Sequence, residues 1–87
     1  MNNQEISKIL SEIGEYLAMG NEFFKARAYR NVAVTIAELT EQLSDVYARG
    51  GVSGIEAVPG VGASIGEKII ELLTTGKCVY YDELRSR

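Results

Sequence analysis

The chain has 87 residues, with 9 Lys+Arg against 12 Asp+Glu, one Cys and no His. This length allows one small domain, and we expect residues 1–87 to share one core. The formal net charge of −3 excludes a global positive field that would attract nucleic acid, so any anion site has to be local. Without His and with only Cys78, the chain lacks the residues for a disulfide framework, the usual zinc sites and His-based acid–base catalysis.

Compartment and membrane contact follow from the same inspection. No apolar run approaches the length of a membrane span, and the polar start MNNQEISK does not resemble a signal peptide. We therefore expect a cytoplasmic protein with no membrane contact. Cys78 has no evident partner, so we expect it to be unreactive.

The first predicted helix begins after Asn2 or Asn3, because either side chain can cap a helix. Apolar residues then recur at steps of three and four, which is the period of one helical face: Ile6, Ile9, Leu10, Ile13 and Leu17. Gly20 is predicted to take the left-handed conformation that ends such a helix.

Two further helices are predicted before residue 52. Asn21 is expected to cap the second, whose apolar stripe contains Phe23, Ala26, Tyr29, Ala33, Ile36 and Ala37. Thr40 is expected to begin a third short helix, which Gly50 and Gly51 close.

The segment at about 53–76 reads as a very short helix, a tight hairpin and a longer helix. Pro59 prevents the first helix from continuing, and Gly60 and Gly62 allow backbone angles that are closed to other residues. Gly76 ends the longer helix, and a last short helix is expected over residues 79–84. Since no alternating strand pattern appears, we predict an all-α protein, a compact bundle of four to five short helices.

The hairpin sequence VPGVG predicts an anion site. Its glycines let the backbone approach a ligand, and its N–H groups lie at the N-terminus of the next helix, where a phosphate oxygen is favoured. We expect backbone carbonyls of Glu56, Val58 and Val61 to be able to hold a Na⁺ or K⁺ ion, with no other cofactor required. Contacts to phosphate do not read bases, so the expected DNA binding is independent of sequence.

Other glycine motifs do not fit the hairpin. A dinucleotide-binding loop needs a third Gly where Ile65 stands, and a P-loop needs Ser or Thr where Cys78 follows Gly76 and Lys77. A tight helix–helix turn without a ligand remains the alternative.

The order of motifs resembles the amino-terminal helix-hairpin-helix domain of family X DNA polymerases, the eight-kilodalton, lyase-type domain of the polymerase beta kind in its bacterial and archaeal form. The matching stretches are NQEISKILSEIGEYL, FFKARAYRNVAVTI, VPGVGASIGEKIIELLTTGK and YYDEL, in order over nearly the whole chain. The resemblance implies binding to the 5′-phosphate side of gapped or nicked DNA in base excision repair, and in some members removal of a 5′-deoxyribose phosphate.

The resemblance also implies roles for individual residues. Lys68 matches the lysine that forms a Schiff base with the sugar aldehyde, which requires an uncharged amine. Lys25 and Tyr29 match positions that bind the sugar phosphate and shape the pocket, and Glu67 matches an acidic neighbour of the nucleophile. Tyr29 also lies on the apolar stripe, where core packing is the alternative.

Three positions depart from the family pattern. Ser64 and Tyr80 stand where the polymerase beta type carries phosphate-binding lysines, and Phe24 stands in place of a histidine. Fewer cations imply weaker phosphate capture and a poorer nucleophile. A surface lysine or a plain phosphate contact is therefore the alternative reading of Lys68.

Together these features predict a DNA-phosphate site formed by Gly60, Val61, Gly62, Ser64, Lys25, Arg27, Arg30 and Lys68. The leading function is sequence-independent DNA binding by a monomer or by one module of a larger polymerase chain. The alternatives are an active 5′-deoxyribose-phosphate lyase and a protein-interaction domain without a DNA site. Nothing resembles the paired aspartates that bind polymerase metals, so this chain is not expected to polymerise nucleotides by itself.

Overall fold

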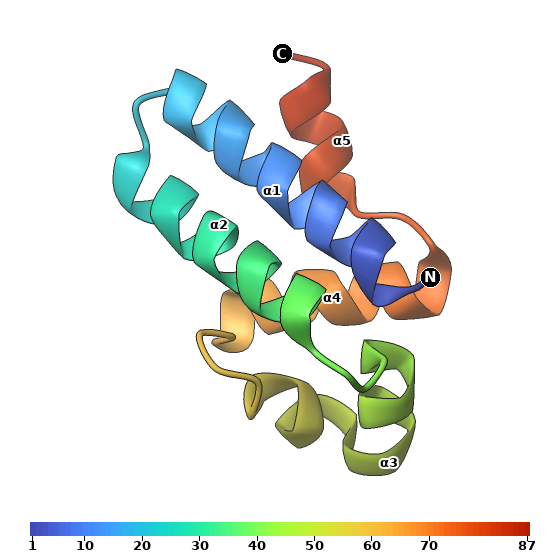
Figure 1. Cartoon of the computed structure of the whole chain (residues 1–87). Helices are drawn as coiled ribbons and strands as arrows, with labels where there is room; N and C mark the ends of the chain where they lie inside the picture. The colour runs from blue at the N-terminus through green and yellow to red at the C-terminus, as the bar shows by residue number, and fades with distance from the viewer.

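The computed structural model describes residues 1–87 as five helices without strands. These are α1 (Asn3–Met19), α2 (Phe23–Glu38), α3 (Leu43–Glu56), α4 (Ala63–Thr75) and α5 (Val79–Arg85). The helices α1 and α2 lie side by side and antiparallel, α4 crosses one end of this pair, α3 lies beyond α4, and α5 packs against α1 (Figure 1). The predicted all-α bundle is confirmed. None of its helices combines the length and the apolar character that a membrane crossing needs.

All buried apolar side chains belong to one continuous core, to which every helix contributes. The stripe predicted for α2 is wrong at its two ends, because Phe23 and Ala37 are exposed. Val32, which the predicted stripe omitted, is buried instead. The prediction assigned a single apolar face to α2. The helix also packs against the hairpin, and Val32 makes that contact.

The N-terminus of α1 is fixed by a reciprocal cap. Asn2 accepts a hydrogen bond from the Glu5 N–H at 2.8 Å, and the Glu5 carboxylate accepts one from the Asn2 N–H at 3.0 Å. This is the capping box, which satisfies two donors that the first helical turn leaves free.

The turn between α1 and α2 differs from the prediction. Gly20 has φ −88°, and the left-handed residue is Asn21 at φ 65°. A short polar side chain tolerates this conformation better than most others do. Because Asn21 is used in this way, it does not cap α2, which begins after Glu22 without a side-chain cap.

The third helix begins later than predicted and is broken. It starts at Leu43 after Gln42, and not at Thr40. Gly51 has φ 60° and ψ −147°, which interrupts α3 where the sequence predicted its end. The part of α3 after Gly51 is thus the short first helix of the hairpin, and Gly76, at φ 77°, ends α4 as predicted.

The buried side chain of Asn3 joins the start of α1 to the start of α3. Its amide nitrogen donates to the Glu41 carbonyl at 2.8 Å, and its amide oxygen accepts from the Leu43 N–H at 2.8 Å. The Gln42 side chain in turn accepts from the Asn3 N–H at 3.0 Å. The bond to Leu43 satisfies a backbone N–H that would otherwise be buried without a partner, and the other two satisfy part-buried backbone groups.

Close packing of α1 on α2 depends on Gly14. A Cβ atom at this position would lie 3.0 Å from Cγ of Arg30 and 3.1 Å from the backbone oxygen of Ala26. We expect Gly14→Ala to lower the free energy of unfolding by about 1–3 kcal/mol, the usual cost of overpacking. Urea denaturation measures it, and a loss no larger than that of Gly50→Ala, where a Cβ would meet nothing within 4 Å, would contradict it.

Candidate nucleic-acid interface

The loop between α3 and α4 is a hydrogen-bonded turn held in the core. The Val61 N–H donates to the Val58 carbonyl at 3.0 Å, Pro59 follows Val58, and Gly60 has φ 85°. This is the pattern of a type II turn, which requires a positive φ at its third residue. Val58 and Val61 are buried, so the turn is anchored on both sides and presents Gly60 and Gly62 outward.

The N-terminus of α4 presents free backbone donors beside this turn. Gly62 caps the helix, and its carbonyl accepts from the Gly66 N–H at 2.8 Å, which is the first bond of the helix. The N–H groups of Ala63, Ser64 and Ile65 therefore lack helical partners and lie at the positive end of the helix dipole.

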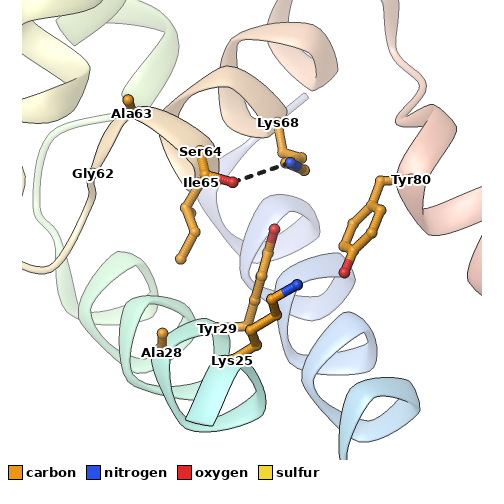
Figure 2. Close-up of a pocket in the computed structure, with 9 residues that line it drawn as sticks. All are labelled: Lys25, Ala28, Tyr29, Gly62, Ala63, Ser64, Ile65, Lys68 and Tyr80. Carbon is orange, nitrogen blue, oxygen red and sulfur yellow. Dashed lines mark hydrogen bonds between the residues drawn. The ribbon is translucent and has the colours of Figure 1, made fainter. Parts of the chain in front are cut away.

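These donors line an open pocket of about 470 Å³ formed by three helices. Lys25, Ala28 and Tyr29 come from α2, the residues Gly62–Ile65 and Lys68 come from α4 and its cap, and Tyr80 comes from α5. Figure 2 shows the side chains of Lys25, Tyr29, Lys68 and Tyr80 converging on one space in front of the α4 N-terminus. The structure thus brings together residues that are up to 55 positions apart in the sequence.

The pocket is locally positive although the chain is acidic overall. Its lining holds two lysines and no carboxylate. Lys25 pairs with Glu22 at 3.5 Å, but both groups are exposed, and such a pair contributes little. The Lys68 amine donates to the Ser64 hydroxyl at 3.2 Å (Figure 2). An anion entering the pocket would therefore meet two ammonium groups and the helix N-terminus.

Two tyrosines form the inner wall of the pocket. The rings of Tyr29 and Tyr80 stack with centroids 6.2 Å apart and an interplanar angle of 29°. Burial raises the pKa of the Tyr29 phenol above its ordinary value, and the neighbouring Tyr80 and Cys78 add to this shift. The Tyr29 hydroxyl thus remains a protonated donor at neutral pH.

Three of the predicted site residues lie away from the pocket. Arg27 is two residues after Lys25, about 200° around the helix axis, so the two side chains leave α2 on opposite sides. Arg30 extends over Gly14 of α1, and Glu67 lines a separate depression on the outer side of the hairpin. Of the predicted phosphate contacts, Gly62, Ser64, Lys25 and Lys68 line the pocket, and Gly60 and Val61 belong to the adjoining turn.

The carbonyl groups predicted to hold a cation are at the turn. Those of Glu56 and Val61 accept no hydrogen bond, and that of Val58 accepts the one from Val61. Oxygen ligands suit Na⁺ and K⁺, and free carbonyls fit such an ion, so the prediction of a monovalent cation stays open. No group of three or more His, Cys, Asp or Glu side chains could hold another metal.

Sequence reasoning assigned no role to Tyr80, Ala28 or Phe24 in the site. Tyr80 had been noted only as a missing cation, and Ala28 lies one turn after Phe24 on the same side of α2. Phe24 is 95% exposed, which is unusual for so large an apolar side chain. Its exposure was not predictable from residue type, and it is not among the residues that line the pocket.

The remaining tyrosine of α5 is outside the pocket. The Tyr81 hydroxyl donates to the Glu12 carboxylate of α1, and this bond raises the pKa of Tyr81 to about 12. The exposed Arg85 side chain lies over the Tyr81 ring, 5.1 Å from its centroid. These contacts attach α5 to α1. Cys78, at the start of α5, is buried, and burial raises the pKa of its thiol, as expected for an unreactive cysteine.

Comparison with known protein families agrees with this geometry. Residues 1–78 match the family described as the helix-hairpin-helix domain. The match extends from the first residue of the chain to the end of α4 and beyond, so it includes the turn, the α4 N-terminus and both pocket lysines. The chain is therefore a member of the helix-hairpin-helix domain family.

Proposed function

We propose that this chain binds DNA at a gap or nick, on the side of the 5′-phosphate, without regard to base sequence. The observation that carries the proposal is the pocket in which Lys25, Lys68 and the free N–H groups of α4 face the same space. A terminal phosphate fits this arrangement better than an internal one, because its extra charge and exposed oxygens can use several donors at once. Family membership supports DNA binding that is not sequence-specific.

The wider setting follows from the sequence resemblance. Motifs of the α2 segment FFKARAYR and of the hairpin occur here together, as they do in the amino-terminal domains of family X DNA polymerases. We propose that the chain serves as such a module in DNA repair, in the cytoplasm of its cell.

The first prediction concerns the phosphate. Gapped DNA with a 5′-phosphate should bind more tightly than the same DNA with a 5′-hydroxyl, because only the former presents a dianionic group to the two lysines. The dependence of log K on log salt should correspond to about two to four phosphate contacts. Fluorescence anisotropy at low salt measures both quantities. Equal failure of both probes to bind at high protein concentration would favour a protein-interaction domain.

A second candidate function is 5′-deoxyribose-phosphate lyase activity. It is favoured by the position of Lys68, whose partly buried side chain ends at the pocket beside the α4 N-terminus. In this reaction the amine attacks C1′ of the opened sugar, water leaves, and β-elimination then expels the phosphate.

Borohydride trapping on an incised abasic substrate tests the lyase. Both Lys68→Ala and Lys68→Arg should abolish the covalent adduct, since guanidinium is never appreciably deprotonated. A mere phosphate contact would instead tolerate Arg and lose affinity with Ala. An adduct that survives Lys68→Ala would transfer the chemistry to another amine, with Lys25 the first to replace. Absence of an adduct from the wild-type protein, on DNA that it binds, would leave a binding module.

A further inference from the structure

The position of the Lys68 amine depends on one contact from α5 and one from its own helix, α4. Its amine lies 4.8 Å from the centroid of the Tyr80 ring, over the ring face. The same amine donates to the Ser64 hydroxyl at 3.2 Å. Tyr80 is itself positioned by stacking on Tyr29, whose ring is buried in the core.

Both contacts are made by the ammonium group of the lysine. The face of an aromatic ring attracts a cation and offers nothing comparable to a neutral amine. The Ser64 hydroxyl accepts a hydrogen bond, which an ammonium donates more strongly than an amine does. No carboxylate lines the pocket to compete for the ammonium, and Lys25 supplies the other cation that faces this space.

We propose that Tyr80 is the specificity-determining residue of this pocket: it holds the Lys68 ammonium against its ring, so that the site retains a phosphate and reacts slowly with an aldehyde. The inference rests on the proposed function for its phosphate ligand. The expected reactivity of Lys68 toward an aldehyde does not depend on DNA and applies to the free protein as well. Tyr80 is a positioning residue, since it acts on the ligand through Lys68.

The reactivity of Lys68 can be measured without DNA by reductive methylation. The uncharged amine bonds to the carbon of ¹³C-formaldehyde, water leaves, and cyanoborohydride supplies the hydride that reduces the imine to a secondary amine. Lys77 serves as an internal reference, because it is exposed and has no ring or carboxylate partner. Limiting formaldehyde and NMR detection of the methylated lysines give the relative rates of the two amines.

In the wild-type protein Lys68 should react more slowly than Lys77. Tyr80→Leu should raise the relative rate of Lys68 about two- to five-fold, and Tyr80→Phe, which keeps the ring, should leave it unchanged. The Lys68 Cε protons should show an upfield ring-current shift in wild type and Tyr80→Phe that disappears in Tyr80→Leu. Tyr81→Leu, which removes the neighbouring ring outside the pocket, should change neither quantity.

DNA binding provides the second readout. The preference for a 5′-phosphate over a 5′-hydroxyl should fall about two- to five-fold in Tyr80→Leu and remain in Tyr80→Phe. A purely structural role for Tyr80 would undock α5 and could free Lys68 as well, so faster methylation supports the proposal only if the α5 amides of Tyr80→Leu exchange with deuterium as slowly as in wild type.

Two results would overturn the inference. One is a wild-type Lys68 that reacts as fast as Lys77 and shows no ring-current shift. The other is a Tyr80→Leu variant in which Lys68 is no more reactive than in wild type. If the wild-type protein showed no preference for a 5′-phosphate, the proposed function would be rejected. The methylation result would still decide the role of Tyr80.

Discussion

Gly62→Leu is expected to weaken binding of 5′-phosphorylated gapped DNA at least tenfold while the protein stays folded. Gly62 lines the pocket at the cap of α4, and a Cβ atom there would meet nothing within 4 Å. Its φ of −97° is open to any residue, so the substitution creates no backbone strain. Leucine is a poorer capping residue than glycine, which costs about 1 kcal/mol. The side chain would occupy the space through which a phosphate reaches the free N–H groups.

Gly50→Leu is the matched control for this test. A Cβ at Gly50 would also meet nothing within 4 Å, and the residue lies in α3 away from the pocket. Anisotropy titrations with the same DNA, together with thermal unfolding of both variants, separate a blocked site from a damaged fold. Normal DNA binding by a well-folded Gly62→Leu variant would show that the loop is a turn and not a site.

Asn3→Ala is expected to cause the largest loss of stability. It leaves the buried Leu43 N–H without its acceptor and the Glu41 carbonyl without its donor. An unsatisfied buried group such as the Leu43 N–H costs about 1–3 kcal/mol, and the part-buried Glu41 carbonyl costs less, so the free energy of unfolding should fall by roughly 2–4 kcal/mol. Since small domains have only about 5–15 kcal/mol in total, urea denaturation should show a large shift of the midpoint.

The adjacent asparagine provides the comparison. Asn2→Ala removes only the exposed cap of α1, whose typical value is about 1 kcal/mol. If Asn3→Ala were no more destabilising than Asn2→Ala, the link between α1 and α3 would not contribute as its geometry implies.

Local sequence signals predicted the elements of the fold well, because each one has a local physical cause. Pro59 restricts the backbone locally, and Gly60 and Gly76 can adopt the positive φ that a turn or a helix end requires, so the hairpin and the end of α4 were predictable. The turn after α1 was harder to predict, because Gly20 and Asn21 can both adopt the left-handed conformation. Packing decides which of the two does so.

The candidate site was predicted in part. Lys25, Tyr29 and Lys68 were expected from the family resemblance, Ser64 was included beside the hairpin, and all four line the pocket. Lys25, Arg27 and Arg30 were all assigned to the phosphate site, with Arg27 and Arg30 on a face that Lys25 does not share. Only Lys25 lines the pocket, because the way α2 packs decides which face reaches it. The stacking of Tyr80 on Tyr29 could not be predicted from local sequence. The two residues are 51 positions apart, and only tertiary packing brings their rings together.

The attachment of α5 has a consequence for the dynamics of the pocket. This helix has seven residues, which is too few for stability in isolation. Leu84 is its one buried side chain. Its local opening should therefore require less free energy than global unfolding, and its amide protons should exchange with deuterium sooner than those of α1 and α2. Each opening would remove Tyr80 from the pocket and release Lys68 from its ring. A bound 5′-phosphate that contacts Lys68 would favour the docked state, so the slowing of exchange on adding DNA should be concentrated in α5, a helix that supplies only one wall of the site.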